Sequence, residues 1–197
     1  VAAFALLERR RAVWSGIVMT LACLMKFQSL YFAPVYALVL LTAYPPRKCL
    51  QTIAAGLGTA AAVFLPFMAR SGFALPFRIY FGGFEKYAGT SLNAFNLYGA
   101  LGLNYQSIDT ELIGGITAQT VSMIASILAG VLLVYLFFTA TTRSLWLFGF
   151  VFMQTIFLFS ARMHERYQIP ALAMALAACF CHKSRKLFIG FAALTVI

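Results

Sequence analysis

Two long apolar runs, residues 115–140 and 145–160, follow one another with only a short polar break between them. The hydrocarbon core of a bilayer is about 30 Å thick, so the first run is long enough to cross it as a helix and the second nearly so. The chain is 62% hydrophobic and only 10% charged, too little charge to cover the surface of a soluble domain. These features predict an all-α, polytopic helical membrane protein.

The basic residues gather at the ends of the apolar runs. A net charge of +10 could indicate nucleic-acid binding, but most of the Lys and Arg residues fall in four short clusters, at 8–11, 47–48, 143 and 183–186. Basic clusters at the ends of spans mark the cytoplasmic side of a membrane protein and attract anionic lipid headgroups. The charge pattern therefore indicates membrane lipid as a partner and no nucleic acid.

With these clusters on the cytoplasmic side, the chain traces about six transmembrane or half-spanning helices and a truncated last one. The helices are expected at residues 12–25, 29–44, 50–69, 114–140, 145–160 and 169–180, with a last crossing from 187. We expect a single transmembrane domain over residues 1–197, with 70–113 as an extracytoplasmic or interfacial loop segment. Because the chain opens on Val1 and closes on an apolar run too short to span, we expect it to be the C-terminal part of a larger protein.

A charged cluster lies between two apolar runs on the opposite side of the expected membrane. It contains Arg162, His164, Glu165 and Arg166. On a helix, Arg162 and Arg166 would lie on one face, and two guanidiniums with an imidazole suit the oxygens of a phosphate. The alternative is interfacial anchoring, in which the arginines snorkel and Glu165 pairs locally. The H-E-x-x-H zinc-protease motif is excluded, because Gln168 stands where it needs a histidine.

Lys26 stands at the tip of a hairpin whose two arms are hydrophobic. It is either a snorkelling lysine or a cation that faces the same anion as the arginines. Gln28, two residues on, would add hydrogen-bond donors and an acceptor.

Aromatic residues alternate with polar side chains between residues 75 and 98. The polar members are Arg78, Glu85, Lys86, Asn93 and Asn96. This pattern predicts a segment lying along the membrane surface, and flat rings with amides also suit sugar binding. The alternative is a loop that only dips its aromatic rings into lipid. Farther along, Asp109 is expected to cap a helix that begins near residue 112.

Three motifs, in this order, resemble the GT-C superfamily of membrane glycosyltransferases. They are K-x-Q-x-L-Y-x-A-P from Lys26, P-F-R…G-F-E-K…N-A-F-N from Pro76, and F-x-x-x-x-H-E-R from Phe159. The likeness covers about residues 21–175 and is greatest to the dolichyl-phosphate-glucose glucosyltransferases of N-glycan precursor assembly and to bacterial GPI-mannosyltransferase-like relatives. The glucosyltransferases more often have H-E-K and K-Q at these motifs, so the variants in this chain look more like the bacterial branch.

The resemblance implies an inverting transfer of a glucose- or mannose-like hexose from a polyprenyl-phosphate sugar. The acceptor would be a glycan, a lipid-linked molecule or a protein on the non-cytoplasmic face of the bacterial inner membrane or the endoplasmic reticulum. In the family, the catalytic carboxylate lies in a first outer loop that this chain does not contain, so the base is expected upstream of Val1. No cofactor is expected beyond the lipid-phosphate sugar as co-substrate, although a divalent metal ion stays open.

The expected site has two parts. The residues expected to bind the donor phosphate are Lys26, Gln28, Arg162, His164 and Arg166, with Glu165 supporting them. Those expected to line a groove for the sugar or acceptor are Arg78, Glu85, Asn93 and Asn96. Cations at the phosphate would stabilise the leaving group, and a carboxylate base would deprotonate the acceptor hydroxyl. The alternatives are a transporter or flippase of an anionic lipid or lipid-linked sugar, in which the same cations bind a passing phosphate, and a non-catalytic membrane subunit.

Overall fold

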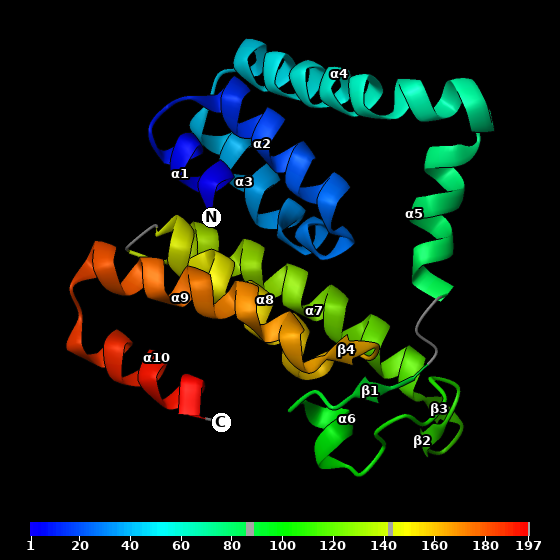
Figure 1. Cartoon of the computed structure of the whole chain (residues 1–197). Coiled ribbons are helices and arrows are strands. Elements are labelled where there is room, and N and C mark those ends of the chain that lie inside the picture. The colour runs from blue at the N-terminus through cyan, green and yellow to red at the C-terminus, as the bar shows by residue number, and fades with distance from the viewer. Residues whose placement is uncertain (86–88, 142–143, 197) are drawn as a thin grey trace. The chain divides into compact units, whose positions relative to one another are not determined.

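The computed structural model describes residues 1–85, 89–141 and 144–196, except the side chains of residues 81, 83–85 and 196. Over these residues the chain is mostly helical, which confirms the all-α prediction (Figure 1). It divides into two compact units, Val1–Tyr87 and Ala88–Ile197, and each is described by itself. The expected single transmembrane domain stays a prediction.

The first unit is built of helices alone over its described residues. They are α1 (Ala2–Glu8), α2 (Ala12–Met25), the 3-10 helix η1 (Phe27–Phe32), α3 (Ala33–Ala43), α4 (Pro46–Ser71) and α5 (Leu75–Glu85). Lys26, whose backbone is extended, separates α2 from η1, and its place at the tip of a hairpin stays a prediction. Helix α4 begins with Pro46, whose ring suits the first turn, and it ends at Gly72, which takes a φ of 82°.

Small residues bring α2 and α4 together. A Cβ atom added to Gly16 would lie 2.6 Å from Cγ2 of Thr52 and 2.8 Å from its carbonyl oxygen. Close backbone approach through glycine is typical of helix pairs in membranes, where there is no hydrophobic drive between helices. At the C-terminal end of α3, the guanidinium of Arg10 donates to the carbonyl of Ala43 at 2.9 Å and lies over the ring of Tyr44. These contacts hold the helices on both sides of Lys26.

The second unit combines a helical bundle with short strands. Its elements are β1 (Ser91–Leu92), α6 (Leu97–Ala100), β2 (Glu111–Ile113), β3 (Ile116–Thr117), α7 (Ala118–Thr139), α8 (Leu145–Phe159), β4 (Met163–His164), the 3-10 helix η2 (Glu165–Gln168), α9 (Ile169–His182) and α10 (Arg185–Val196). Helix α8 is the core of the unit, since Met153 and Phe157 are fully buried at 0% exposure. It packs against α7 and α9 (Figure 1), and Gly149 leaves room for the side chain of Met174.

Two helices among the described residues are long and apolar enough to cross a membrane. They are α4, with 26 residues, and α7, with 22. Within the chain, only 6% and 17% of their most apolar stretches is buried, whereas a core helix of a soluble protein is buried for most of its length. The exposed apolar surface of both helices agrees with a lipid environment. The predicted number of spans stays a prediction.

One local prediction from the sequence, the Asp109 cap, is wrong, and the helical geometry considered for Arg162 and Arg166 does not apply. Residues 162–168 are not an α-helix, because Arg162 takes a φ of 62° and the chain then enters β4 and η2. Strand pairing after α8 replaces helical hydrogen bonds, so Arg162 and Arg166 do not share a helix face. Asp109 does not cap a helix either, because Gly114 and Gly115 turn the chain through the β2–β3 hairpin first. Helix α7 begins at Ala118, where the side chain of Thr117 caps it.

Candidate functional site

A short parallel strand pair carries the charged cluster in the second unit. Strand β4 pairs with β1, which aligns Met163 with Ser91 and His164 with Leu92. The backbone of His164 also bridges to Asn93, and Arg162 N–H donates to the carbonyl of Thr90 at 2.9 Å. The structure therefore brings the H-E-R and N-A-F-N motifs, far apart in the sequence, to one edge of the unit.

His164 lies between a carboxylate and a guanidinium. Its Nδ1 contacts Oε2 of Glu165, and its Nε2 lies 3.0 Å from Nη2 of Arg166. A guanidinium only donates, so Nε2 must accept, and the ring proton then sits on Nδ1, which is in contact with the Glu165 carboxylate but has no hydrogen-bond partner among the described residues. His164 is 20% exposed, which leaves its ring in reach of solvent. In this geometry, the imidazole orients Arg166, and Arg166 is the residue that presents N–H donors outward.

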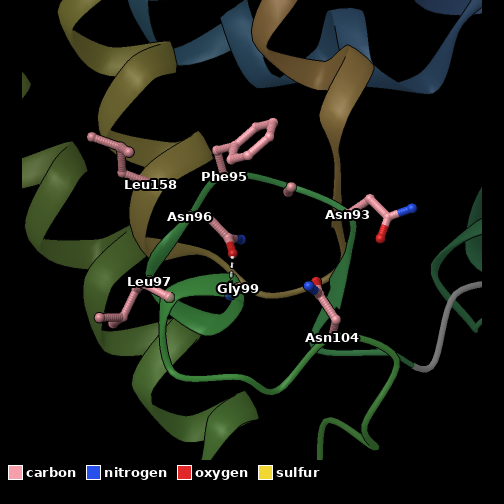
Figure 2. A pocket seen from close by; sticks show the side chains of 9 residues that line it. Asn93, Phe95, Asn96, Leu97, Gly99, Asn104 and Leu158 are labelled. Carbon is pink, nitrogen blue, oxygen red and sulfur yellow. Dashed lines mark hydrogen bonds between the residues drawn. The ribbon is translucent and has the colours of Figure 1, made fainter. Parts of the chain in front are cut away.

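A pocket of about 640 Å³ lies beside the Asn93 bridge (Figure 2). Its lining residues are Asn93, Ala94, Phe95, Asn96, Leu97, Gly99, Ala100, Asn104 and Leu158. The volume falls in the range of small-molecule sites, which is about 300–1,000 Å³. None of the lining residues is charged, so the pocket offers amides and apolar surface, while the charged groups stand at the neighbouring strand.

The two asparagines predicted for the groove have different surroundings. Asn96 is 4% exposed. Its Oδ1 accepts from Gly99 N–H at 2.9 Å (Figure 2), and its Nδ2 donates to the carbonyl of Ser160 at 3.3 Å. Asn93 is exposed, with a φ of 56°. Asn96 therefore caps α6 and ties it to the end of α8, whereas the amide of Asn93 is available to a ligand.

Two serines of helix α7 form hydrogen bonds with the segment that connects α8 to β4. Ser122 Oγ accepts from Ala161 N–H at 2.8 Å, and the hydroxyls of Ser126 and Ser160 lie 3.0 Å apart. Tyr98, fully buried, donates to the carbonyls of Ala118 and Phe159 at 3.1 and 3.3 Å, and burial raises the pKa of its hydroxyl. These bonds hold the chain where it leaves α8 and enters β4.

Sequence reasoning missed several of these residues. Ser122 and Ser126 stand four apart on an apolar helix, which is a signal that could have indicated a polar stripe. Asn104 carries no such signal, because it reaches the pocket only when its segment bridges back to Ser91. Tyr98 belongs to the aromatic pattern of residues 75–98, in which nothing distinguishes a buried ring from an exposed one.

The remaining predicted residues belong to the first unit. Lys26 and Arg78 are exposed, and Gln28 is 9% exposed, with no partner for Oε1 among the described residues. Glu85 ends α5, but its side chain and all of Lys86 lie outside the described residues. A shared site for Lys26 and the second-unit cluster stays a prediction.

The described residues hold no group of three or more His, Cys, Asp or Glu side chains that could bind a metal ion. Comparisons of the chain with known protein families, with curated proteins and with solved structures found no match.

Proposed function

We propose that the chain is part of an inverting membrane glycosyltransferase that moves a hexose from a polyprenyl-phosphate sugar to an acceptor outside the cytoplasm. The observation that carries the proposal is the Glu165–His164–Arg166 arrangement, whose His164 is bridged through its backbone to Asn93 of an uncharged pocket. An anion-binding group beside a neutral pocket matches a donor that has both a phosphate and a sugar.

Arg166 is the proposed donor-phosphate ligand. Only Nη2 of its guanidinium is engaged by His164, and the other N–H groups suit two phosphate oxygens at once. Glu165 holds the His164 proton on Nδ1, so the imidazole keeps its lone pair directed at the guanidinium. The pair therefore positions Arg166, while Arg162, Lys26 and Gln28 remain further candidates for the phosphate.

In the reaction, the bond between the anomeric carbon and the phosphate oxygen breaks, and its electron pair stays on the phosphate. Arg166 stabilises that charge as it develops. An acceptor hydroxyl attacks the anomeric carbon from the opposite face, which inverts its configuration, and its proton passes to a carboxylate base.

The proposal sets the reaction at a membrane. Helices α4 and α7 are long and apolar enough to cross one, and a polyprenyl chain stays in the bilayer while its phosphate reaches the interface. The site would then face the non-cytoplasmic side, opposite the basic clusters, as the charge pattern predicts.

The test is hexose transfer by the full-length protein in proteoliposomes, with a polyprenyl-phosphate hexose as donor. We expect Arg166→Ala and His164→Ala to lower the rate of transfer, Arg166→Ala by roughly 100-fold because a charge-stabilising donor is lost. Arg185→Ala removes an equal charge at the start of α10 and should leave the rate unchanged. Full activity in both site variants would remove Arg166 and His164 from the mechanism.

The rival function is a flippase of an anionic lipid, in which Arg166 binds a phosphate in transit. The same proteoliposomes distinguish the two functions. A transferase places labelled hexose on the acceptor, whereas a flippase moves the intact donor to the other leaflet and leaves the sugar–phosphate bond unbroken.

A further inference from the structure

We infer that the pocket lined by Asn93, Phe95 and Asn104 binds an uncharged pyranose ring, and that the phosphate stays outside it. The inference deepens the proposed function, on which it rests for the reaction that the bound sugar undergoes. Its chemistry can be tested without any transfer reaction.

The pocket presents the groups that a sugar ring needs. Phe95 is 65% exposed and stands at one edge of the pocket, with Asn104 at another (Figure 2). A large exposed ring has a hydrophobic cost that a bound ligand would remove, and one face of a pyranose carries C–H groups that pack on such a ring. The leucines 97 and 158 add apolar surface on a further side.

The amides supply the polar half of the recognition. Asn93 and Asn104 are exposed, and among the described residues neither side chain forms a hydrogen bond. An amide has two donor hydrogens and an acceptor oxygen, so it can bind a hydroxyl in either sense. Two unengaged amides beside an apolar ring therefore match an array of sugar hydroxyls.

Because none of the lining residues is charged, the pocket favours the sugar of the donor or acceptor over a phosphate. A phosphate in the pocket would lose water without gaining a counter-charge, which is costly. A neutral sugar has no such cost, and the guanidinium of Arg166 stands on the segment that follows the Asn93–His164 bridge. The division assigns the sugar to the pocket and the phosphate to the strand edge.

Asn96 is a positioning residue in this arrangement, although it lies in the same motif. Its oxygen accepts from Gly99 and one of its N–H groups donates to Ser160, and the side chain is only 4% exposed, so it serves the fold of the loop first. It shapes the loop that presents Phe95.

The experiment measures binding of methyl hexopyranosides by saturation-transfer NMR, with the whole protein in lipid nanodiscs. The probes are the methyl glucosides and mannosides, with linear sorbitol and inorganic phosphate as comparison probes. We expect at least one methyl hexoside to bind and phosphate not to compete. Asn104→Ala and Phe95→Leu should each weaken binding by about five- to tenfold, the loss of one hydrogen bond or one ring contact. Phe95→Tyr should retain it.

Two control variants match the changes. Gln106→Ala removes an exposed amide from the same segment, and Phe180→Ala removes an exposed ring from α9; neither residue lines the pocket. Phe95→Leu remains apolar, so it would still insert into lipid if anchoring were its role. Asn104→Asp, similar in size, provides a second variant in case Asn104→Ala misfolds, and it should also weaken binding.

The inference is overturned if no methyl hexoside binds, if sorbitol binds as well as the hexosides, if phosphate competes with them, or if the pocket and control variants bind alike. Loss of binding in the pocket variants supports it even if the protein transfers no hexose, in which case the proposed function fails and the sugar site stands. Transfer that depends on Arg166, together with unchanged binding in the pocket variants, would leave the function standing and remove this site.

Discussion

His164 has both ring nitrogens engaged by residues of opposite charge, and this makes it an orienting residue. The Glu165 carboxylate contacts Nδ1, and Nε2 accepts from Arg166. A side chain that keeps one donor and one acceptor should retain part of this order, whereas an apolar one should lose it.

We therefore expect His164→Gln to transfer hexose roughly tenfold faster than His164→Leu, because a retained hydrogen bond to a charged group is worth about 1.5 kcal/mol or more. Initial rates at saturating acceptor measure the difference. Equal rates in the two variants would mean that the imidazole does not act through its hydrogen bonds.

The two asparagines have different roles: Asn96 stabilises the fold, whereas Asn93 is available to a ligand. Asn96→Ala leaves two backbone partners, at Gly99 and Ser160, without their bonds, and we expect it to lower the free energy of unfolding by about 1–3 kcal/mol. Asn93→Gly should cost little, since glycine accepts a φ of 56°. The apparent midpoint of thermal unfolding in detergent checks both, and a larger loss for Asn93→Gly would contradict these roles.

Among the secondary-structure elements, the long apolar helices could be predicted from the sequence, whereas the short strands that connect them could not. Residues 12–25 and 145–160 were predicted as helices, and α2 (Ala12–Met25) and α8 (Leu145–Phe159) have these bounds to within one residue. Continuous hydrophobicity and clear charged breaks define such segments locally. Strands β1 and β4 are two residues each and exist only through pairing with each other, so their local pattern gives no signal.

The site residues divide in the same way, into those with a local sequence signal and those placed by contacts with distant parts of the chain. Asn93 and Asn96 could be selected from the sequence because amides beside aromatics suit a sugar. Asn104 could not, because a backbone bridge between distant residues delivers it to the pocket. Residues 163–164 form a strand because residues 90–93 offer β4 backbone partners that sequence periodicity does not contain.

Helix α7 should control the order of the H-E-R segment through Ser122. Its hydroxyl accepts the Ala161 N–H just before β4, so Ser122→Ala should speed hydrogen–deuterium exchange across residues 158–166. Thr139→Ala is the control, because that hydroxyl bonds only within its own helix, to Tyr135. If exchange in this segment matches the wild type, α7 does not hold it.

At the scale of the whole molecule, the charge pattern predicts opposite sides for the 183–186 cluster and the pocket segment. Single cysteines at Ser184 and Gln106, with the four native cysteines replaced, can be tested with a membrane-impermeant maleimide. We expect Gln106→Cys to react from the non-cytoplasmic side and Ser184→Cys to react only after the membrane is opened. Reaction of Ser184→Cys alone before opening would reverse the orientation and place the site in the cytoplasm.

The proposed transferase breaks a sugar–phosphate bond with inversion, using Arg166 to stabilise the leaving phosphate. The measurement is NMR of the product formed by the full-length protein from a polyprenyl-phosphate hexose of known anomeric configuration. The account predicts an acceptor-linked hexose of opposite configuration, formed roughly 100-fold more slowly by Arg166→Ala and at the wild-type rate by Arg185→Ala. Product with retained configuration, or an intact donor after prolonged incubation with an acceptor that the cell glycosylates, would contradict it.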